Sequence, residues 1–80
     1  MGMNPLIRVA LSTLLERNRT QLDIHREIAM VTVRQYARME TPFPAIWIDE
    51  QNRIVNGHHR VLAAEIRGDV DVLAIRQKEW

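Results

Sequence analysis

Cysteine is missing from this 80-residue sequence, and its absence removes several kinds of chemistry at once. Without thiols the chain cannot form a disulfide bond, a thiolate metal site or a nucleophilic cysteine, and a reducing compartment is expected. Long apolar runs are also missing, and the chain does not open with the basic flank and apolar stretch of a signal peptide. We therefore expect a cytoplasmic protein with no membrane segment.

A strong excess of charge is missing too. Eleven lysines and arginines stand against ten acidic residues, which leaves a formal net charge of +1. Such a balance does not provide the broad basic surface that grips duplex DNA, so DNA is a possible partner only through a local cluster of cations. Ten of the eleven cations are arginine, whose planar guanidinium binds phosphate or carboxylate through two donors.

The length predicts one small domain spanning residues 1–80, with a core from about residue 6 to about residue 76. A chain of this size buries only about 60% of the surface that its unfolded form exposes. Its stability is therefore expected to be modest, and a homodimer or a bound ligand would add to it.

The first half of the chain reads as a strand followed by a helix. Leu6–Leu11 alternates as a half-buried strand does, and Ser12–Leu15 could extend it or form a short turn. Thr20 and Asp23 have the spacing of a capping box, which predicts a helix that starts at Thr20 or Gln21.

Within that helix, Ile24, Ile28 and Val31 recur at helical spacing and are expected to form the core-facing stripe. His25 falls beside the stripe and is expected to be solvated. Thr32 is a candidate N-cap for a second helix over Val33–Met39, so one kinked helix and two consecutive helices are both allowed. This second part is expected to turn three side chains toward the sheet, namely Val33, Tyr36 and Ala37. The segment Thr41–Pro44, with two prolines, is expected to end it.

The second half reads as a hairpin, a helix and a last strand. Ala45–Asp49 and Arg53–Asn56 are β-prone runs joined by a polar tip, in which Asn52 is a candidate for the left-handed conformation. A helix is expected to open at Gly57 and to end at Gly68, followed by a strand over residues 70–75 and a tail ending in Trp80. The sum is a β-α(α)-β-β-α-β order, an α+β domain with a small mixed sheet covered by helices.

The stretch from Asn56 to Arg60 is the clearest candidate site. It joins a strand to a helix through a glycine, and the helix opens on two histidines and an arginine. A helix N-terminus already carries about half a positive charge and unpaired N–H groups, so basic residues there favour a bound anion such as phosphate. An equally simple alternative has Asn56 capping the helix, Arg60 paired with a carboxylate and the histidines solvated.

The order of elements and three short motifs resemble the ParB/sulfiredoxin superfamily, in particular the small ParB-like nuclease domains of bacteria, phages and plasmids. The motifs are Val33-x-x-Tyr36-Ala37-x-Met39, Phe43-Pro44-x-Ile46 and Gly57-x-His59-Arg60-x-x-Ala63-Ala64. The resemblance covers the chain from about Ile7 to Ile75 and implies a ParB/sulfiredoxin-like fold. It also implies that the turn at Gly57 binds the phosphates of a nucleotide such as ATP or CTP, with Mg²⁺.

The resemblance assigns roles to single residues. Phosphate binding is expected from Asn56, Gly57, His58, His59 and Arg60, together with Arg19 from the loop before the first helix. His59 and His58 are the candidate catalytic residues, as general acid or base. The two histidines are adjacent and point to different faces of a helix, so no metal site is expected from them.

Departures from the family motifs exclude some of the family's activities. His58 stands where sulfiredoxins have their catalytic cysteine, so this chain is not expected to repair sulfinic acid. The turn also lacks the glycine-glutamate-arginine-arginine of ParB partition proteins, and Asn56 replaces an aspartate that many ParB-like nuclease domains carry there. We expect a nucleotide- or phosphate-binding domain with possible NTPase or phosphoryl-transfer activity. The alternatives are a ParB-like DNA nuclease and a non-catalytic protein-interaction module.

Overall fold

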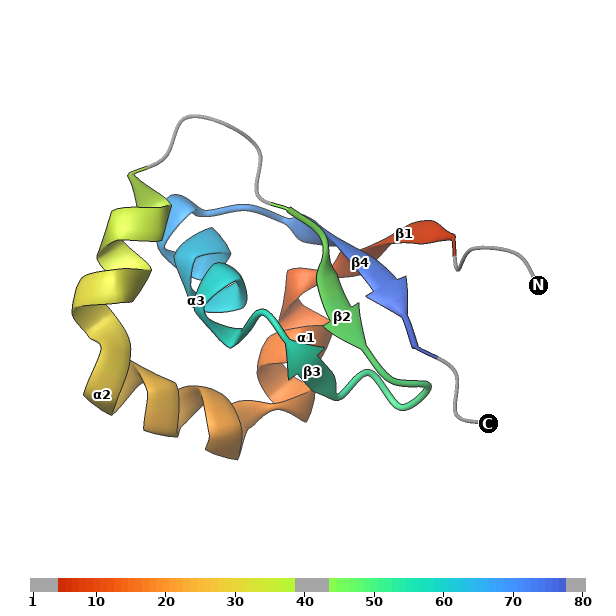
Figure 1. Cartoon of the computed structure of the whole chain (residues 1–80), viewed down its shortest axis with the longest axis horizontal. Helices are drawn as coiled ribbons and strands as arrows, with labels where there is room; N and C mark the ends of the chain where they lie inside the picture. The colour runs from red at the N-terminus through yellow and green to blue at the C-terminus, as the bar shows by residue number, and fades with distance from the viewer. Residues whose placement is uncertain (1–4, 39–43, 78–80) are drawn as a thin grey trace.

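In the part of the chain that the structure describes, four strands and three helices follow one another in the order β-α-α-β-β-α-β (Figure 1). This computed structural model describes residues 5–38 and 44–77. The elements are β1 (Leu6–Ala10), α1 (Leu11–Arg17), α2 (Arg19–Ala37), β2 (Ile46–Ile48), β3 (Ile54–Asn56), α3 (His58–Arg67) and β4 (Asp71–Arg76). The predicted α+β class with a small mixed sheet is confirmed. The predictions for Met39, for the segment 41–43 and for Trp80 lie outside the described residues.

The four strands form one mixed sheet in the order β1-β4-β2-β3. β4 pairs antiparallel with β1, where Arg8 lies opposite Leu73, and parallel with β2, where Trp47 lies opposite Ile75. β2 and β3 pair antiparallel as the predicted hairpin, with Asn52 at its tip in the left-handed conformation, at a φ of 63°. The predictions of the hairpin and of its turn residue are confirmed.

Helix α3 lies between the sheet and α2, as Figure 1 shows. Its residues Val61–Ala64 are almost fully buried, and α3 as a whole packs against α2 and α1 and contacts β2 and β4. The expectation that Val33, Tyr36 and Ala37 face the sheet is corrected, since α2 packs chiefly against α3. The buried core comprises Val9, Leu11, Leu14, Leu22, Val33, Ile46, Ile48, Ile54, Val61–Ala64 and Ala74.

The sequence prediction for residues 11–15 is wrong, because a helix begins directly after β1. Leu11 and Leu14 are one helical turn apart and both are buried, so the leucine run follows the period of a helix rather than that of a strand. The strand ends where the N–H of Leu11 donates a hydrogen bond to the carbonyl oxygen of Val70, at 2.9 Å. α1 packs against α3 and α2 and against the strands β1 and β4.

The predicted core stripe of the second helix is also wrong. Ile24, Ile28 and Val31 are 48%, 75% and 71% exposed, whereas Leu22 and Val33 on the opposite side of α2 are fully buried. α2 begins at Arg19 without a side-chain cap and is kinked at Ala29, whose φ of −134° and ψ of 22° are not helical. Two helical segments thus meet at this kink within α2, and the break lies at Ala29 rather than at Thr32, the predicted N-cap of the second segment. The kink bends α2 around α3 (Figure 1), so the face on the inside of the bend is buried.

Asn18 joins the helices to the hairpin and is the one polar residue that is buried among those the structure describes. Its side-chain Nδ2 donates to the carbonyl oxygens of Leu14 at 2.9 Å and Asn52 at 3.0 Å, and its Oδ1 accepts the N–H of Ile54 at 2.9 Å. The start of α2 is thereby fixed against the hairpin whose second strand leads into α3.

Candidate phosphate site at the start of helix α3

The turn from β3 into α3 requires glycine at position 57. Gly57 has a φ of 113°, and a Cβ atom added there would lie 2.5 Å from Cγ2 of Ile46. The hairpin exit and β2 therefore approach each other closely at this point. Gly57 also occupies the N-cap position of α3, and no side chain caps the helix, so the alternative in which Asn56 caps it is wrong.

The first amide groups of α3 are left open by this geometry. The N–H of Val61 makes the first intrahelical hydrogen bond, to the carbonyl oxygen of Gly57 at 3.0 Å. The N–H groups of His58, His59 and Arg60 precede that bond and have no capping side chain. Such groups attract anions, because the helix dipole adds about half a positive charge at this end.

Three imidazole rings meet beside these amides, and one of them comes from α2. The ring of His25 stacks on that of His58 with centroids 4.6 Å apart, and it meets the ring of His59 edge to face at 5.1 Å. His25 is half-buried, and its Nδ1 atom is buried with no partner in the described part of the chain. The expectation of a solvated His25 is therefore wrong. Sequence reasoning missed its place in the site, since only the packing of α2 on α3 brings it there.

Burial and the charges of neighbouring rings lower the pKa values of two of these histidines, His58 and His59. Burial lowers the pKa of His58 below its ordinary value of 6.5, and the charges on His25 and His59 lower it further. Burial and then the charge on His25 also lower the pKa of His59. Without a ligand, His58 and His59 are thus mostly uncharged at pH 7.

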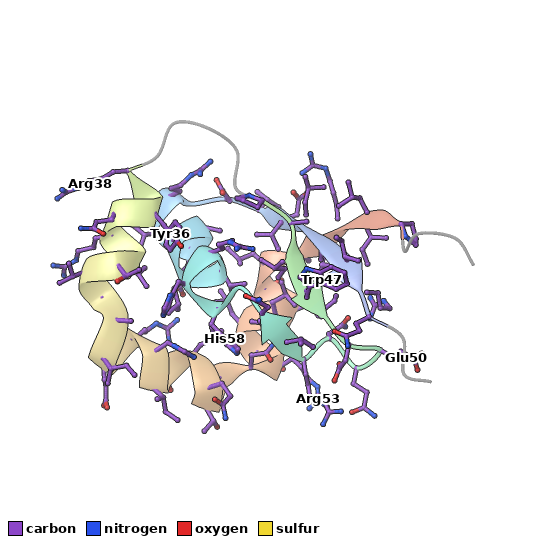
Figure 2. The ribbon with its side chains drawn as sticks, in the orientation of Figure 1. Tyr36, Arg38, Trp47, Glu50, Arg53 and His58 are labelled. Atoms are coloured by element: carbon purple, nitrogen blue, oxygen red, sulfur yellow. The ribbon has the colours of Figure 1, made fainter. Side chains whose placement is uncertain are left out.

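A surface hollow of about 230 Å³ opens where these groups converge, and we call it the α2–α3 hollow. Figure 2 shows Tyr36 of α2 and His58 of α3 in the space between the two helices. Its described lining contains hydrogen-bond donors and the cation Arg60 but no carboxylate. The lining residues are His25, Tyr36, Val55, Asn56, Gly57, His58, His59 and Arg60.

Arg19 lies at a neighbouring hollow rather than in the same one. A shallow hollow of about 430 Å³ at the α1–α2 junction is lined by Arg19, Arg17 and Arg53, with Glu16 nearby. His58 lines both this hollow and the α2–α3 hollow, so its ring stands between them. The structure thus brings five of the six predicted phosphate-binding residues together and leaves Arg19 on the far side of His58.

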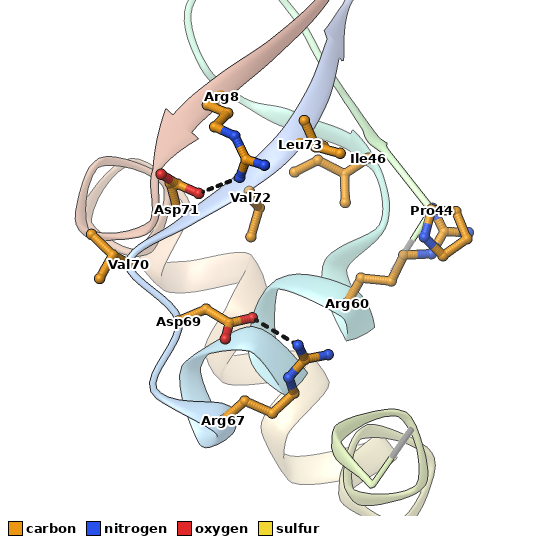
Figure 3. Close-up of a pocket in the computed structure, with 10 residues that line it drawn as sticks. All are labelled: Arg8, Pro44, Ile46, Arg60, Arg67, Asp69, Val70, Asp71, Val72 and Leu73. Carbon is orange, nitrogen blue, oxygen red and sulfur yellow. Dashed lines mark hydrogen bonds and ion pairs between the residues drawn. The ribbon is translucent and has the colours of Figure 1, made fainter. Parts of the chain in front are cut away.

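The side chain of Arg60 extends toward the start of β2. Its Nη1 donates to the carbonyl oxygen of Ala45 at 3.1 Å, and no ion pair of Arg60 with a carboxylate is found in the described residues, which corrects the second part of the simple alternative. Arg60 also lines a hollow of about 290 Å³ between α3 and β4 (Figure 3). In that hollow two of the arginines are paired with aspartates: Arg8 with Asp71 at 2.8 Å, and Arg67 with Asp69 at 3.6 Å.

Neither a cluster of metal ligands nor a membrane-spanning helix is found in the described residues. Across segments 5–38 and 44–77, no three histidine or acidic side chains are grouped so that they could hold a metal ion. No helix in those segments is long and apolar enough to cross a membrane.

Comparisons of the chain with protein-family models, with characterised proteins and with solved structures find no match. The fold class therefore rests on the structure, and the ParB/sulfiredoxin resemblance rests on the sequence motifs.

Proposed function

We propose that this domain binds the phosphate groups of a nucleotide, such as ATP or CTP with Mg²⁺, at the N-terminus of α3. The observation that carries the proposal is the set of open amides of His58, His59 and Arg60 beside a hollow whose described lining has no carboxylate. Amides at a helix start bind anions readily, and a described lining without carboxylates favours this further. The resemblance of the Gly57 turn to the ParB/sulfiredoxin superfamily leads to the same proposal.

The amides, Arg60 and the two histidines of α3 have distinct roles in this proposal. The amides contact phosphoryl oxygens, and the guanidinium of Arg60, held at one nitrogen by the Ala45 carbonyl, offers its remaining N–H donors. The neutral imidazoles of His58 and His59 donate hydrogen bonds and gain a proton when a dianion arrives. His59 would serve as general acid or base if phosphoryl transfer follows, but binding does not require it.

An interaction module is the second candidate, and one observation favours it. Ile28 and Val31 on the outer side of α2 are 75% and 71% exposed. Exposed apolar side chains on neighbouring turns of a helix are a feature of protein-binding surfaces. A partner or a second copy that covered them would stabilise this small domain. The nuclease alternative stays a prediction that no observation in the structure favours.

Thermal unfolding with a panel of ligands tests the first proposal. The panel contains ATP, GTP, CTP, ADP and pyrophosphate, each with and without Mg²⁺, on wild type, on Arg60→Gln and on Arg34→Gln as a matched control. Arg34 is an exposed arginine of α2 that lines neither the α2–α3 hollow nor the two hollows beside it. A ligand at about 100 times its Kd stabilises the fold by about 2.7 kcal/mol, which raises the Tm of a domain this small by about 10 °C or more.

The expected result is a shift in wild type and in Arg34→Gln that is much smaller in Arg60→Gln. Equal shifts in all three proteins would place binding away from α3. No shift with any ligand would contradict nucleotide binding and favour the interaction module, for which light scattering at rising protein concentration is the next measurement.

A further inference from the structure

We propose that His25 is a positioning residue of this phosphate site, which holds the rings of His58 and His59 over the first turn of α3 and makes anion binding depend on proton uptake. The inference rests on the proposed function and goes beyond it, because it assigns a role to a residue of another helix and a pH dependence to the site.

The geometry of the three rings carries the positioning role. The His25 ring stacks on that of His58, with centroids 4.6 Å apart and an interplanar angle of 23°, and it meets the ring of His59 edge to face at 5.1 Å and 83°. A single ring from α2 therefore contacts both histidines of the α3 start, so it restricts their rotation. Stacked and edge-to-face pairs of rings stabilise such an arrangement by dispersion and by their quadrupoles.

The charges around the cluster explain the dependence on protons. Facing it across the α2–α3 hollow are Tyr36 of α2 and Arg60 of α3, and neither is acidic. On the other side of His58 the α1–α2 junction and the hairpin contribute three arginines and Glu16, the arginines being Arg17, Arg19 and Arg53. Protonation of two touching imidazoles is therefore unfavourable until an anion enters.

Proton uptake follows from this balance. The pKa of His58 and of His59 is lowered by burial and by the neighbouring imidazole charges. A bound phosphate dianion counteracts that repulsion and raises both pKa values, so each binding event draws protons from solution near pH 7. Affinity should consequently rise as the pH falls from about 7.5 to about 6.

The test measures binding of pyrophosphate and of ATP with Mg²⁺ by titration calorimetry at these two pH values. Each titration is run in two buffers of different ionisation enthalpy, which gives the number of protons taken up. The proteins are wild type, His25→Phe, His25→Ala and Glu27→Gln, the last being an exposed control on the same helix. Phenylalanine keeps a flat ring and cannot take a proton, whereas alanine removes the ring altogether.

We expect wild type and Glu27→Gln to take up protons and to bind more tightly at the lower pH. His25→Phe should keep its affinity at the higher pH but take up fewer protons, with ring signals of His58 and His59 titrating at higher pH in NMR spectra, because one repelling charge is gone. His25→Ala should lose affinity at both pH values, by about twofold to tenfold, as expected for the loss of ring contacts.

Either of two results would overturn the inference while leaving the proposed function intact. One is a His25→Phe protein with the proton uptake and histidine titration of wild type. The other is a His25→Ala protein, or His25→Gln should alanine fail to fold, with the affinity of wild type. If wild type binds neither ligand at either pH, the proposed function fails and this inference fails with it.

Discussion

Replacement of Asn18 by alanine should destabilise the domain strongly, because this side chain links the helices to the hairpin from within the core. It makes three hydrogen bonds between 2.9 and 3.0 Å, and all three lie in or next to the core. Alanine would leave the buried N–H of Ile54 without its acceptor, which costs about 1–3 kcal/mol. The carbonyl oxygen of Leu14 still accepts a hydrogen bond from the backbone N–H of Asn18, at 3.0 Å, so losing the side-chain bond to this oxygen costs less than losing the bond to Ile54.

The two bonds to carbonyl oxygens add about 0.5–1.5 kcal/mol each, so we expect a total loss of about 2–6 kcal/mol. This is a large part of the 5–15 kcal/mol typical of a whole domain, and it should lower the Tm by about 10 °C or more. Urea unfolding of wild type and Asn18→Ala measures the difference. Asn56→Ala is the control, because Asn56 is exposed, and it should stay within about 0.5 kcal/mol of wild type.

Hydrogen exchange gives a second, local readout of the same change. The amide of Ile54 should be protected in wild type and exchange faster in Asn18→Ala by a factor larger than the global loss of stability explains. The reasoning would be refuted by an Asn18→Ala protein that unfolds at the same urea concentration as wild type. It would equally be refuted if the loss matched that of the exposed control.

Two further predictions concern the start of α3. Gly57→Ala should destabilise the fold by about 1–3 kcal/mol through backbone strain, and further because the new Cβ would clash with Ile46. Gly68→Ala should be destabilised by backbone strain only, since a Cβ there meets no atom within 4 Å. Urea unfolding of both variants measures the difference. The free energy of unfolding should also decrease below about pH 6.5. The pKa values of His58 and His59 are lower in the folded protein than in the unfolded chain, so the unfolded chain binds more protons in this pH range. Stabilisation that is present above pH 6.5 is therefore lost as the pH falls through the pKa values of the folded protein. Urea unfolding at several pH values should show a shallower dependence in a variant with both histidines replaced by glutamine.

Local chemistry made several features readable from the sequence. The glycines at positions 57 and 68 and the asparagine at 52 mark positions where φ is positive, and all three predictions of a turn or helix end are confirmed. Gly68 ends α3 with the paired hydrogen bonds of a Schellman motif, from the N–H of Gly68 to Glu65 and from the N–H of Asp69 to Ala64. These turns and helix ends depend on the backbone conformations open to one or two residues, so the neighbouring sequence is enough to predict them.

The helical half of the chain was harder to read because two signals competed. Over so few residues the leucines of α1 fit a strand extension as well as a helix, and the structure buries Leu11 and Leu14, which are one helical turn apart. In α2 the apolar residues form two faces, and the more regular one, with Ile24 and Ile28, is the exposed one. Periodicity shows that a face is apolar but does not show which face meets a neighbour.

The candidate site divides in the same way. The sequence by itself determined the turn at Gly57 and the basic start of α3, because a glycine step into a helix fixes where the open amides lie. Only the tertiary structure brought His25 against His58 and His59 and moved Arg19 to the neighbouring hollow. The physical reason is that the kink of α2 around α3 sets distances between residues far apart in the chain, and no local preference encodes those distances.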